Sequence, residues 1–239
     1  MARFFSRPGR DRGWLYRLGW WVAMASLWFV GLSVAWVAIY RVLPPPVTMT
    51  MLGDPNGFSK QWTPLSRIDR RMVDAVIAGE DGRFCEHHGF DGAGISAALQ
   101  RDLAGGKLRG GSTISQQTAK NVFLWQGAGW TRYARKGLET WYTVLIEAMW
   151  PKRRIMEMYL NVAETGIGTY GVEAGARRYY NHSAAHLSQV EAARIAAALP
   201  SPKKRAVVGA TGFTRRHGNA IAARSGVVRR AALDDCVYD

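Results

Sequence analysis

Residues 110–121 read GGSTISQQTAKN, and this stretch contains the start of a helix with very little to bury. Two glycines lead into it, and Ser112 or Thr113 supplies a capping hydroxyl for a helix predicted over 113–124. The first N–H groups of a helix have no partner within it, and the macrodipole makes that end positive. The stretch therefore predicts a helix that faces a charged ligand, although a well-capped surface helix has the same pattern.

The side chains of this stretch predict an anion site. Gln116 and Lys120 lie one helical turn apart on the same face, so Lys120 adds a full positive charge. The spacing is not that of a nucleotide-binding P-loop, which requires GxxxxGK[ST]. The groups expected to bind the ligand here are Ser112, Thr113, Gln116, Gln117, Lys120 and Asn121.

Helical spacing of apolar residues recurs along the rest of the chain, whereas the alternation typical of strands is hardly visible. Ser66 with Asp69 matches the capping-box pattern, and Ser188 with Glu191 matches it again. The predicted fold class is all-α. Its helices are expected over 66–79, 113–124, 132–149, 151–161, 171–180 and 189–199.

The N-terminal region contains a candidate membrane anchor. Residues 18–40 carry no charged side chain over 23 positions, which as a helix spans about 35 Å and crosses a bilayer core. Five arginines and one aspartate precede it, so the positive-inside rule keeps 1–17 in the cytoplasm and exports everything after Arg41. A cleaved signal peptide is the alternative, but its apolar region would be shorter.

The charge is strongly positive. The chain has a net charge of +14, and the first 41 residues hold six arginines and one aspartate, which leaves +9 on the exported part. Such an excess favours anionic lipid headgroups or phosphate-bearing substrates as partners. Nucleic acid is not an expected partner of an exported domain without a nucleic-acid-binding motif. The expected organisation is a basic segment, an anchor, a linker, a helical domain and a tail, at 1–17, 18–40, 41–55, 56–225 and 226–239.

The two cysteines, Cys85 and Cys236, do not form a motif. They show neither CxxC nor metal-finger spacing. Because Cys236 lies in the predicted tail, we expect no disulfide between them.

The densest cluster of ionisable residues is EDGRFCEHHGFD at 80–91. Glu80 ends the helix predicted over 66–79, where the helix dipole and the neighbouring Asp81 disfavour a second negative charge. Both effects raise the pKa of Glu80 toward the range of a general acid or base. The alternative is a solvated helix end. A zinc site at His87 and His88 is disfavoured, because adjacent helical residues point about 100° apart and no HExxH motif is present.

Two later helices carry further polar groups. Arg132, Arg135 or Lys136, and Glu139 recur at helical spacing, and we expect one charged row opposite an apolar stripe of Leu138, Tyr142 and Leu145. Such a row is usually a solvated face, but with one carboxylate it also suits a diphosphate and its divalent cation. Glu157 and Asn161 lie one turn apart in the next helix, and there we expect a polar pair that braces neighbouring segments.

Four stretches occur in an order and spacing that resemble the peptidoglycan glycosyltransferases, glycosyltransferase family 51, from about Glu80 to Pro202. They are EDxxFxxHxG at 80–89, GGSTISQQTAKN at 110–121, RKxxE at 135–139 and KxxIxExYLN at 152–161. Because no penicillin-binding domain follows, the chain is similar to the monofunctional members. The Ser-x-x-K at 201–204 is interpreted as a coincidence.

The resemblance implies a lysozyme-like helical lobe with a small membrane-dipping lobe, and membrane lipids as partners. It implies a growing glycan on undecaprenyl diphosphate as donor, lipid II as acceptor, inversion at carbon one, and other wall-synthesis and division proteins as partners. Glu80 becomes the candidate base, and Glu139 a second catalytic carboxylate near an expected Mg²⁺ or Mn²⁺ ion. Diphosphate contacts are expected from Lys120, Arg132, Arg135 and Lys136, and positioning roles from Asp81, Phe84, His87, Glu157 and Asn161.

Two other classes of function remain open at this point. A lytic transglycosylase or muramidase also uses one glutamate in a lysozyme-like lobe, but it does not need a basic row for diphosphate. A non-catalytic membrane-anchored scaffold could bind wall precursors. The expected location is the inner membrane, with a single span and the helical domain on its outer side.

Overall fold

The computed structural model describes residues 13–92, 94, 96, 111–126 and 129–238, and these form two units that divide after Val42. The first unit contains α1 (Trp14–Val42), which includes the whole predicted span 18–40. Its 29 residues extend for about 43 Å. By length and composition, α1 is a candidate membrane span.

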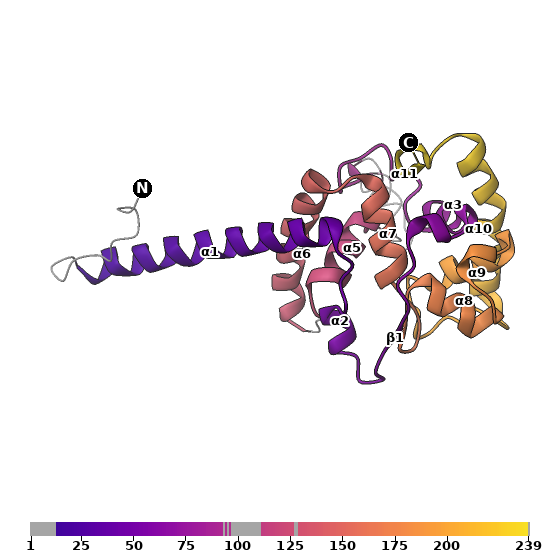
Figure 1. Cartoon of the computed structure of the whole chain (residues 1–239), viewed down its shortest axis with the longest axis horizontal. Coiled ribbons are helices and arrows are strands. Elements are labelled where there is room, and N and C mark those ends of the chain that lie inside the picture. Colours follow the sequence, from indigo (N-terminus) through magenta and orange to yellow (C-terminus); the bar gives the residue numbers. More distant parts are fainter. Residues whose placement is uncertain (1–12, 93, 95, 97–110, 127–128, 239) are drawn as a thin grey trace. The chain divides into compact units, whose positions relative to one another are not determined.

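The second unit is almost entirely helical, which confirms the predicted all-α class. Figure 1 shows α5, α6 and α7 on one side of this unit and α3, α8, α9 and α10 on the other. Its α-helices are α2 (Met49–Leu52), α3 (Arg70–Glu80), α5 (Ile114–Phe123), α6 (Thr131–Met149), α7 (Lys152–Val162), α8 (Val172–Tyr180), α9 (Gln189–Ala198), α10 (Gly212–Arg230) and α11 (Asp235–Tyr238). Two 3₁₀ turns, η1 (Leu65–Arg67) and η2 (Ala184–His186), complete the helical elements of the described residues.

One small sheet was not predicted. β1 (Ser59–Lys60) runs parallel to β3 (Thr169–Tyr170), with Ser59 opposite Thr169, and β2 (Glu164–Gly166) runs antiparallel to β3. Strands of two or three residues are too short to show an alternating pattern. The sheet joins the segment before α3 to the segment after α7.

Local capping explains where several helices begin. Thr113 and Gln116 form a capping box at α5, and Ser188 and Glu191 form the predicted one at α9. At α3 the prediction was wrong in detail, because Asp69 alone caps the helix and accepts from the backbone N–H of Arg71 at 2.8 Å. The preceding residues belong to η1 instead.

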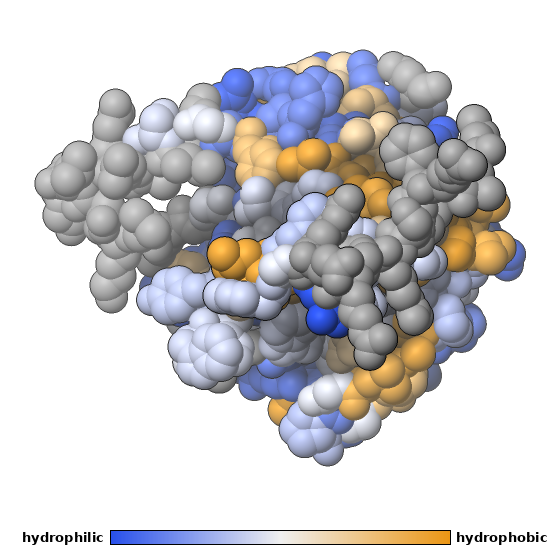
Figure 2. Space-filling model, turned by 90° about the vertical axis from the view of Figure 1, so that its left-hand side faces the viewer, coloured by the Kyte–Doolittle hydropathy of each residue, from blue (hydrophilic) through white to orange (hydrophobic). Residues whose placement is uncertain are grey.

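The core has two parts. α3 packs against α9 and α10, while α5 packs against α6 and α7. The aromatic stretch 122–125 contributes to the second part: Val122, Phe123 and Leu124 are buried, and Phe123 stacks on Tyr142 with ring centroids 4.5 Å apart. Hydrophobic side chains also reach the surface, and Figure 2 shows them on one face as patches between hydrophilic residues.

The C-terminal region differs from the predicted tail. Residues 212–230 form α10, which buries Gly218, Ile221 and Ser225 against the rest of the unit. Because Gly218 and Ser225 add no apolar side chain to this face, the helix lacks the full apolar stripe that sequence reasoning looks for. Residues 226–239 therefore include the end of α10 and all of α11 rather than a free tail.

The expectation that the cysteines are unlinked is wrong. Cys85 and Cys236 form a disulfide across a sequence separation of 151 residues. Ion pairs hold the same region, because Asp234 accepts from Arg70 at 2.6 Å and Asp74 accepts from Arg229 at 2.5 Å. α10 and α11 bring Cys236 to the loop that follows α3. This proximity depends on tertiary structure and is not visible in the sequence.

Candidate active site

Glu80 is the last residue of α3 and lies half-buried at the centre of the candidate site. Its Oε2 accepts a hydrogen bond from Gln117 Nε2 at 2.8 Å, while its Oε1 is buried and has no hydrogen-bond partner among the described residues. The pKa of Glu80 is raised, as predicted, but burial is the largest cause and the charge of Asp81 adds less. Gln117 and the charges of Arg205 and Lys120 oppose the rise.

A second hydrogen bond orients the partner of Glu80. The hydroxyl of Tyr159 donates to Gln117 Oε1 at 3.4 Å, so the amide nitrogen of Gln117 is left to face the carboxylate. Burial keeps the pKa of Tyr159 well above its ordinary value, so the phenol stays protonated as a donor. Glu80, Gln117 and Tyr159 thus form a chain that favours the ionised carboxylate.

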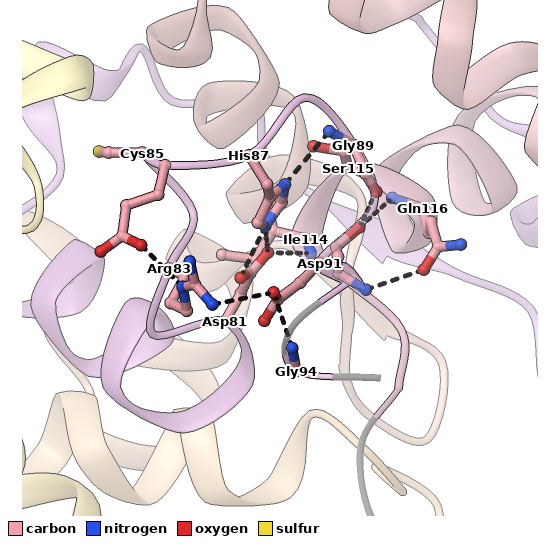
Figure 3. Close-up of polar contacts among 12 residues, drawn as sticks. Asp81, Arg83, Cys85, His87, Gly89, Asp91, Gly94, Ile114, Ser115 and Gln116 are labelled. Carbon is pink, nitrogen blue, oxygen red and sulfur yellow. Dashed lines mark hydrogen bonds and ion pairs between the residues drawn. The ribbon is translucent and has the colours of Figure 1, made fainter. Parts of the chain in front are cut away.

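The loop after Glu80 is held by Asp81 and His87 (Figure 3). His87 Nδ1 accepts from the backbone N–H of Gly89 at 3.2 Å, so its Nε2 carries the proton and donates to Asp81 at 2.9 Å. Asp81 also accepts from the backbone N–H of Ile114 at 3.0 Å. The loop and the start of α5 are therefore one hydrogen-bonded unit.

Phe84 and Gly89 pack this loop against its neighbours. Phe84 is fully buried and lies under the ammonium of Lys152, 4.5 Å from the ring centroid. Gly89 has φ of +90°, and a Cβ there would meet Thr143 at 2.7 Å, so only glycine fits. In this geometry Asp81, Phe84 and His87 hold the loop, and none of the three lines the pocket described below.

The start of α5 does not form the expected anion site. The N–H of Ile114 is bound by Asp81, and the N–H of Gln116 is bound by the Thr113 hydroxyl at 3.2 Å. Gln116 is buried and its Oε1 accepts from the backbone N–H of Thr113 at 3.0 Å, while Ser112 is exposed. Asp81, Thr113 and Gln116 therefore fix the start of α5 to the loop after Glu80.

The next turns of α5 do reach a pocket. Gln117, Lys120 and Asn121 line a cavity of about 380 Å³ together with residues from α6, α7, the sheet and the segment after α9. Its other lining residues are Thr50, Gln126, Arg135, Tyr159, Ala163, Glu164, Tyr170 and Leu199 to Lys204. Glu80 is not among the lining residues, but its carboxylate is hydrogen-bonded to Gln117, which is.

Positive charge dominates the pocket wall. It carries Lys120, Arg135, Lys203 and Lys204 against the single carboxylate Glu164. Burial lowers the pKa of Lys120, and the nearby Arg135 and Lys136 lower it further, while Glu139 and Glu80 act in the opposite direction. In the part of the chain that the structure describes, Lys120 has no ion-pair partner. Such a wall is suited to a polyanionic group.

Glu139 is placed differently from the prediction. It is only 4% exposed and lies on the buried face of α6 with Tyr142, Thr143 and Ile146. Its Oε2 accepts from Arg135 Nη1 at 3.3 Å, and its Oε1 accepts from Lys136. The prediction that Glu139 lies opposite the apolar stripe was wrong, because Glu139 shares the buried face with Tyr142. Its i,i+4 pair with Arg135 holds that guanidinium at the pocket.

Arg132 and Lys136 do not join Arg135 in the pocket. Arg132 is exposed and lies 5.6 Å from the ring centroid of Tyr133, and Lys136 is half-exposed beside Glu139. The residues around Glu139 also do not fit a resident divalent cation. Both of its oxygens bind side-chain cations, and the described residues contain no group of three or more His, Cys, Asp or Glu that could hold a metal.

Glu157 and Asn161 brace the segment before α3. Glu157 Oε1 accepts from the backbone N–H of Leu65 at 3.0 Å. Asn161 binds both backbone groups of Thr63, accepting at 2.8 Å and donating at 2.9 Å. Both side chains connect α7 to residues 63–65, outside the pocket lining.

Sequence reasoning missed the segment from Ser201 to Arg205. Ser201, Lys203 and Lys204 line the pocket, and the charge of Arg205 lowers the pKa of Glu80. The run SPKKR directly after α9 was the available signal, but its Ser-x-x-K spacing was interpreted as a coincidence. Glu164 and Tyr170 were missed as well, because the short strands that carry them have no recognisable pattern.

Comparison with known proteins shows the family of this chain. The model of the transglycosylase family matches residues 48–226. A biosynthetic peptidoglycan transglycosylase from Caulobacter vibrioides is 48% identical over 204 residues, which cover 84% of this chain and 88% of the relative. Proteins of the same description from Xanthomonas axonopodis pv. citri and Rhodospirillum centenum are 46% and 47% identical, covering 94% and 87% of this chain and 90% of each relative. The chain therefore belongs to the transglycosylase family, the peptidoglycan glycosyltransferases that its four motifs resemble.

Proposed function

We propose that this glycosyltransferase polymerises lipid II into glycan strands. The growing chain on undecaprenyl diphosphate is transferred to the 4-hydroxyl of a new lipid II, and undecaprenyl diphosphate leaves. The observation that carries the proposal is the position of Glu80, a half-buried carboxylate with one unpartnered oxygen beside a cation-lined pocket. A base next to an anion site is what a transfer with a diphosphate leaving group requires.

Glu80 is assigned the role of general base. Its Oε1 is free to accept the proton of the attacking hydroxyl, while Oε2 stays bound to Gln117. Burial raises the pKa of this carboxyl, which brings the base closer to the working pH. Direct displacement by the hydroxyl at carbon one leads to inversion there.

The leaving diphosphate is assigned to the cations of the pocket. Lys120 and Arg135 line it from α5 and α6, and the Glu139 ion pair holds Arg135 in a fixed orientation. Positive groups that are already in place stabilise the charge that develops on the leaving oxygen without further rearrangement. Both Glu139 oxygens are bound by side chains, so Glu139 is assigned the role of holding Arg135 and not that of a metal ligand.

The proposal includes a location. α1 is suited to cross the inner membrane once, with the arginine-rich N-terminus inside and the second unit outside. Such an anchor keeps the site at the bilayer surface, where lipid-linked donor and acceptor are found. Membrane lipids and other wall-synthesis and division proteins are proposed partners for the same reason.

The test compares synthesis with cleavage. The detergent-solubilised full-length protein is incubated with labelled lipid II in one reaction and with purified wall material in another. Long glycan that lysozyme digests, formed only from lipid II, is the expected result. Cleavage of wall material without any polymer would overturn the proposal in favour of a lytic enzyme, and binding of lipid II without either reaction would favour a scaffold.

A further inference from the structure

Glu164 is the one carboxylate on the wall of the cation-lined pocket in the described part of the chain. It opens β2, and its side chain is only 9% exposed. Its Oε1 is buried and has no hydrogen-bond partner among the described residues. A buried carboxylate oxygen without a hydrogen bond is costly, so a group that enters the pocket and donates a hydrogen bond to Glu164 is favoured there.

The nearest cation does not satisfy this oxygen. Lys203 Nζ lies 3.7 Å from Glu164 Oε1, beyond hydrogen-bond distance, and instead binds Asp54 Oδ2 at 3.0 Å. The Asp54 side chain is fully buried and also accepts from the Tyr170 hydroxyl at 2.8 Å. Lys203 is thus hydrogen-bonded to Asp54 and only ion-paired with Glu164, which lines the pocket and keeps one oxygen without a hydrogen bond in the described residues.

The charge pattern of the pocket separates two kinds of ligand group. Lys120 and Arg135 attract a diphosphate, whereas Glu164 repels it, because a diphosphate at neutral pH is anionic and has no donor to offer. Sugar hydroxyls and acetamido N–H groups do donate. A ligand ammonium is a poor fit, because Lys203 and Lys204 already line the same wall.

We propose that Glu164 is a sugar-binding residue of this pocket, which accepts a hydrogen bond from a hydroxyl or acetamido N–H of the substrate's disaccharide. This inference rests on the proposed function and adds a specificity determinant to it. The hydrogen bond orients the substrate, with its diphosphate toward Lys120 and Arg135 and its sugar toward β2. A wrong orientation is penalised twice, since it leaves one oxygen of Glu164 without a hydrogen bond and sets the carboxylate against the diphosphate.

The test measures binding of three ligands: lipid II, a lipid II analogue without the stem peptide, and a prenyl diphosphate without sugar. Glu164→Ala and Glu164→Gln are compared with their parent in the full-length Glu80→Gln protein, which prevents turnover. Hydrogen bonds to a charged group predict about tenfold to a hundredfold weaker binding of both sugar-bearing ligands by the alanine variant. The glutamine variant, which keeps the shape and a neutral acceptor, is expected to lose less. Binding of the sugar-free diphosphate stays unchanged or becomes tighter.

Glu86→Ala is the matched control, because Glu86 is half-exposed and pairs with Arg83 outside the pocket. It should not change binding of any ligand. Thermal unfolding of each variant shows whether the substitution has lowered the stability of the fold, which includes the Asp54–Lys203 contact beside Glu164.

Three results would overturn the assignment. Unchanged binding of lipid II by Glu164→Ala removes it, and so does an equal loss for sugar-bearing and sugar-free ligands. A loss that disappears with the peptide-free analogue assigns Glu164 to the peptide instead of the sugar.

If the wild-type protein neither binds nor polymerises lipid II, the proposed function fails and the Glu164 assignment falls with it. If wild type is active and only the variant data disagree, the Glu164 assignment alone fails.

Discussion

Replacing Gln117 with methionine should move the acidic limb of the pH–rate profile upward. Gln117 Nε2 donates to Glu80 Oε2 at 2.8 Å, and this bond is stronger to the ionised carboxylate than to the neutral acid. A hydrogen bond contributes about 1.5–3 kcal/mol with a charged partner and about 0.5–1.5 kcal/mol with a neutral one. The difference of about 1–1.5 kcal/mol corresponds to about one pH unit.

The sign follows from the role of Glu80 as a base. The carboxylate must be ionised to accept a proton, so activity rises with pH through the pKa of Glu80, which burial already raises. Loss of the Gln117 bond raises that pKa further, and the rise in activity begins at higher pH. At a pH well above the acidic limbs of both the wild-type and the variant profiles, the rate of the variant should approach that of the wild type.

The assay is the initial rate of glycan formation from labelled lipid II across a pH series, expressed as kcat/KM. Tyr159→Phe is the matched control, because it removes only the 3.4 Å bond to Gln117 Oε1 and leaves the carboxylate contact. A limb that does not move, or moves to lower pH, contradicts Glu80 as the titrating base. So does an equal shift in the tyrosine variant.

Three further predictions concern the charged pocket, the disulfide and a buried acid. Arg135→Met should lower kcat/KM for lipid II by about tenfold to a hundredfold. Arg132→Met, at an exposed position outside the pocket lining, should change it less than about twofold. Equal losses in the two variants would show that Arg132 also binds the substrate. Replacing both Cys85 and Cys236 by serine should lower the free energy of unfolding, measured by chemical denaturation, by about 2–5 kcal/mol. Reductant should then not lower the stability of this variant further. An unchanged denaturation midpoint in the variant would contradict the disulfide. Burial raises the pKa of Asp74 from 3.8 to about 6, so its contribution to stability is present below pH 4 and is lost as pH rises through 6. The melting temperature of Asp74→Asn should therefore change less than that of wild type between pH 4 and 6, and parallel curves would refute this.

Most helices could be predicted because their signals are local. The bounds of α5 and α6 lie within one residue of the predicted 113–124 and 132–149. A capping box joins residues three apart, and an amphipathic stripe repeats within one helix. Both are visible in a short window of sequence.

The C-terminal fold could not be predicted for the opposite reason. α10 packs through small residues such as Gly218 and Ser225, which carry no hydrophobic signal. Cys236 lies next to Cys85 only in the folded chain, in which α3, α9 and α10 pack together. Contacts over 151 residues depend on tertiary structure and leave no trace in local spacing.

The site was predicted in part. Glu80 comes from one motif and Gln117 and Lys120 come from another, and the structure brings them to one pocket wall or its edge. The direction of Glu139 was wrong, because helical spacing shows which residues share a face but not whether that face is covered. Glu164 lies in a strand of three residues and had no pattern to reveal it.

The most direct test of the account is lipid II polymerisation by Glu80→Gln beside Glu86→Gln, with lipid II binding measured for both. Glu86 is a nearby, half-exposed carboxylate that pairs with Arg83, so its loss controls for charge in the same loop. The account predicts that Glu80→Gln binds lipid II as wild type does but forms no glycan, while Glu86→Gln retains full polymerisation. Glycan formation by Glu80→Gln at the wild-type rate would contradict the assignment of Glu80 as the base.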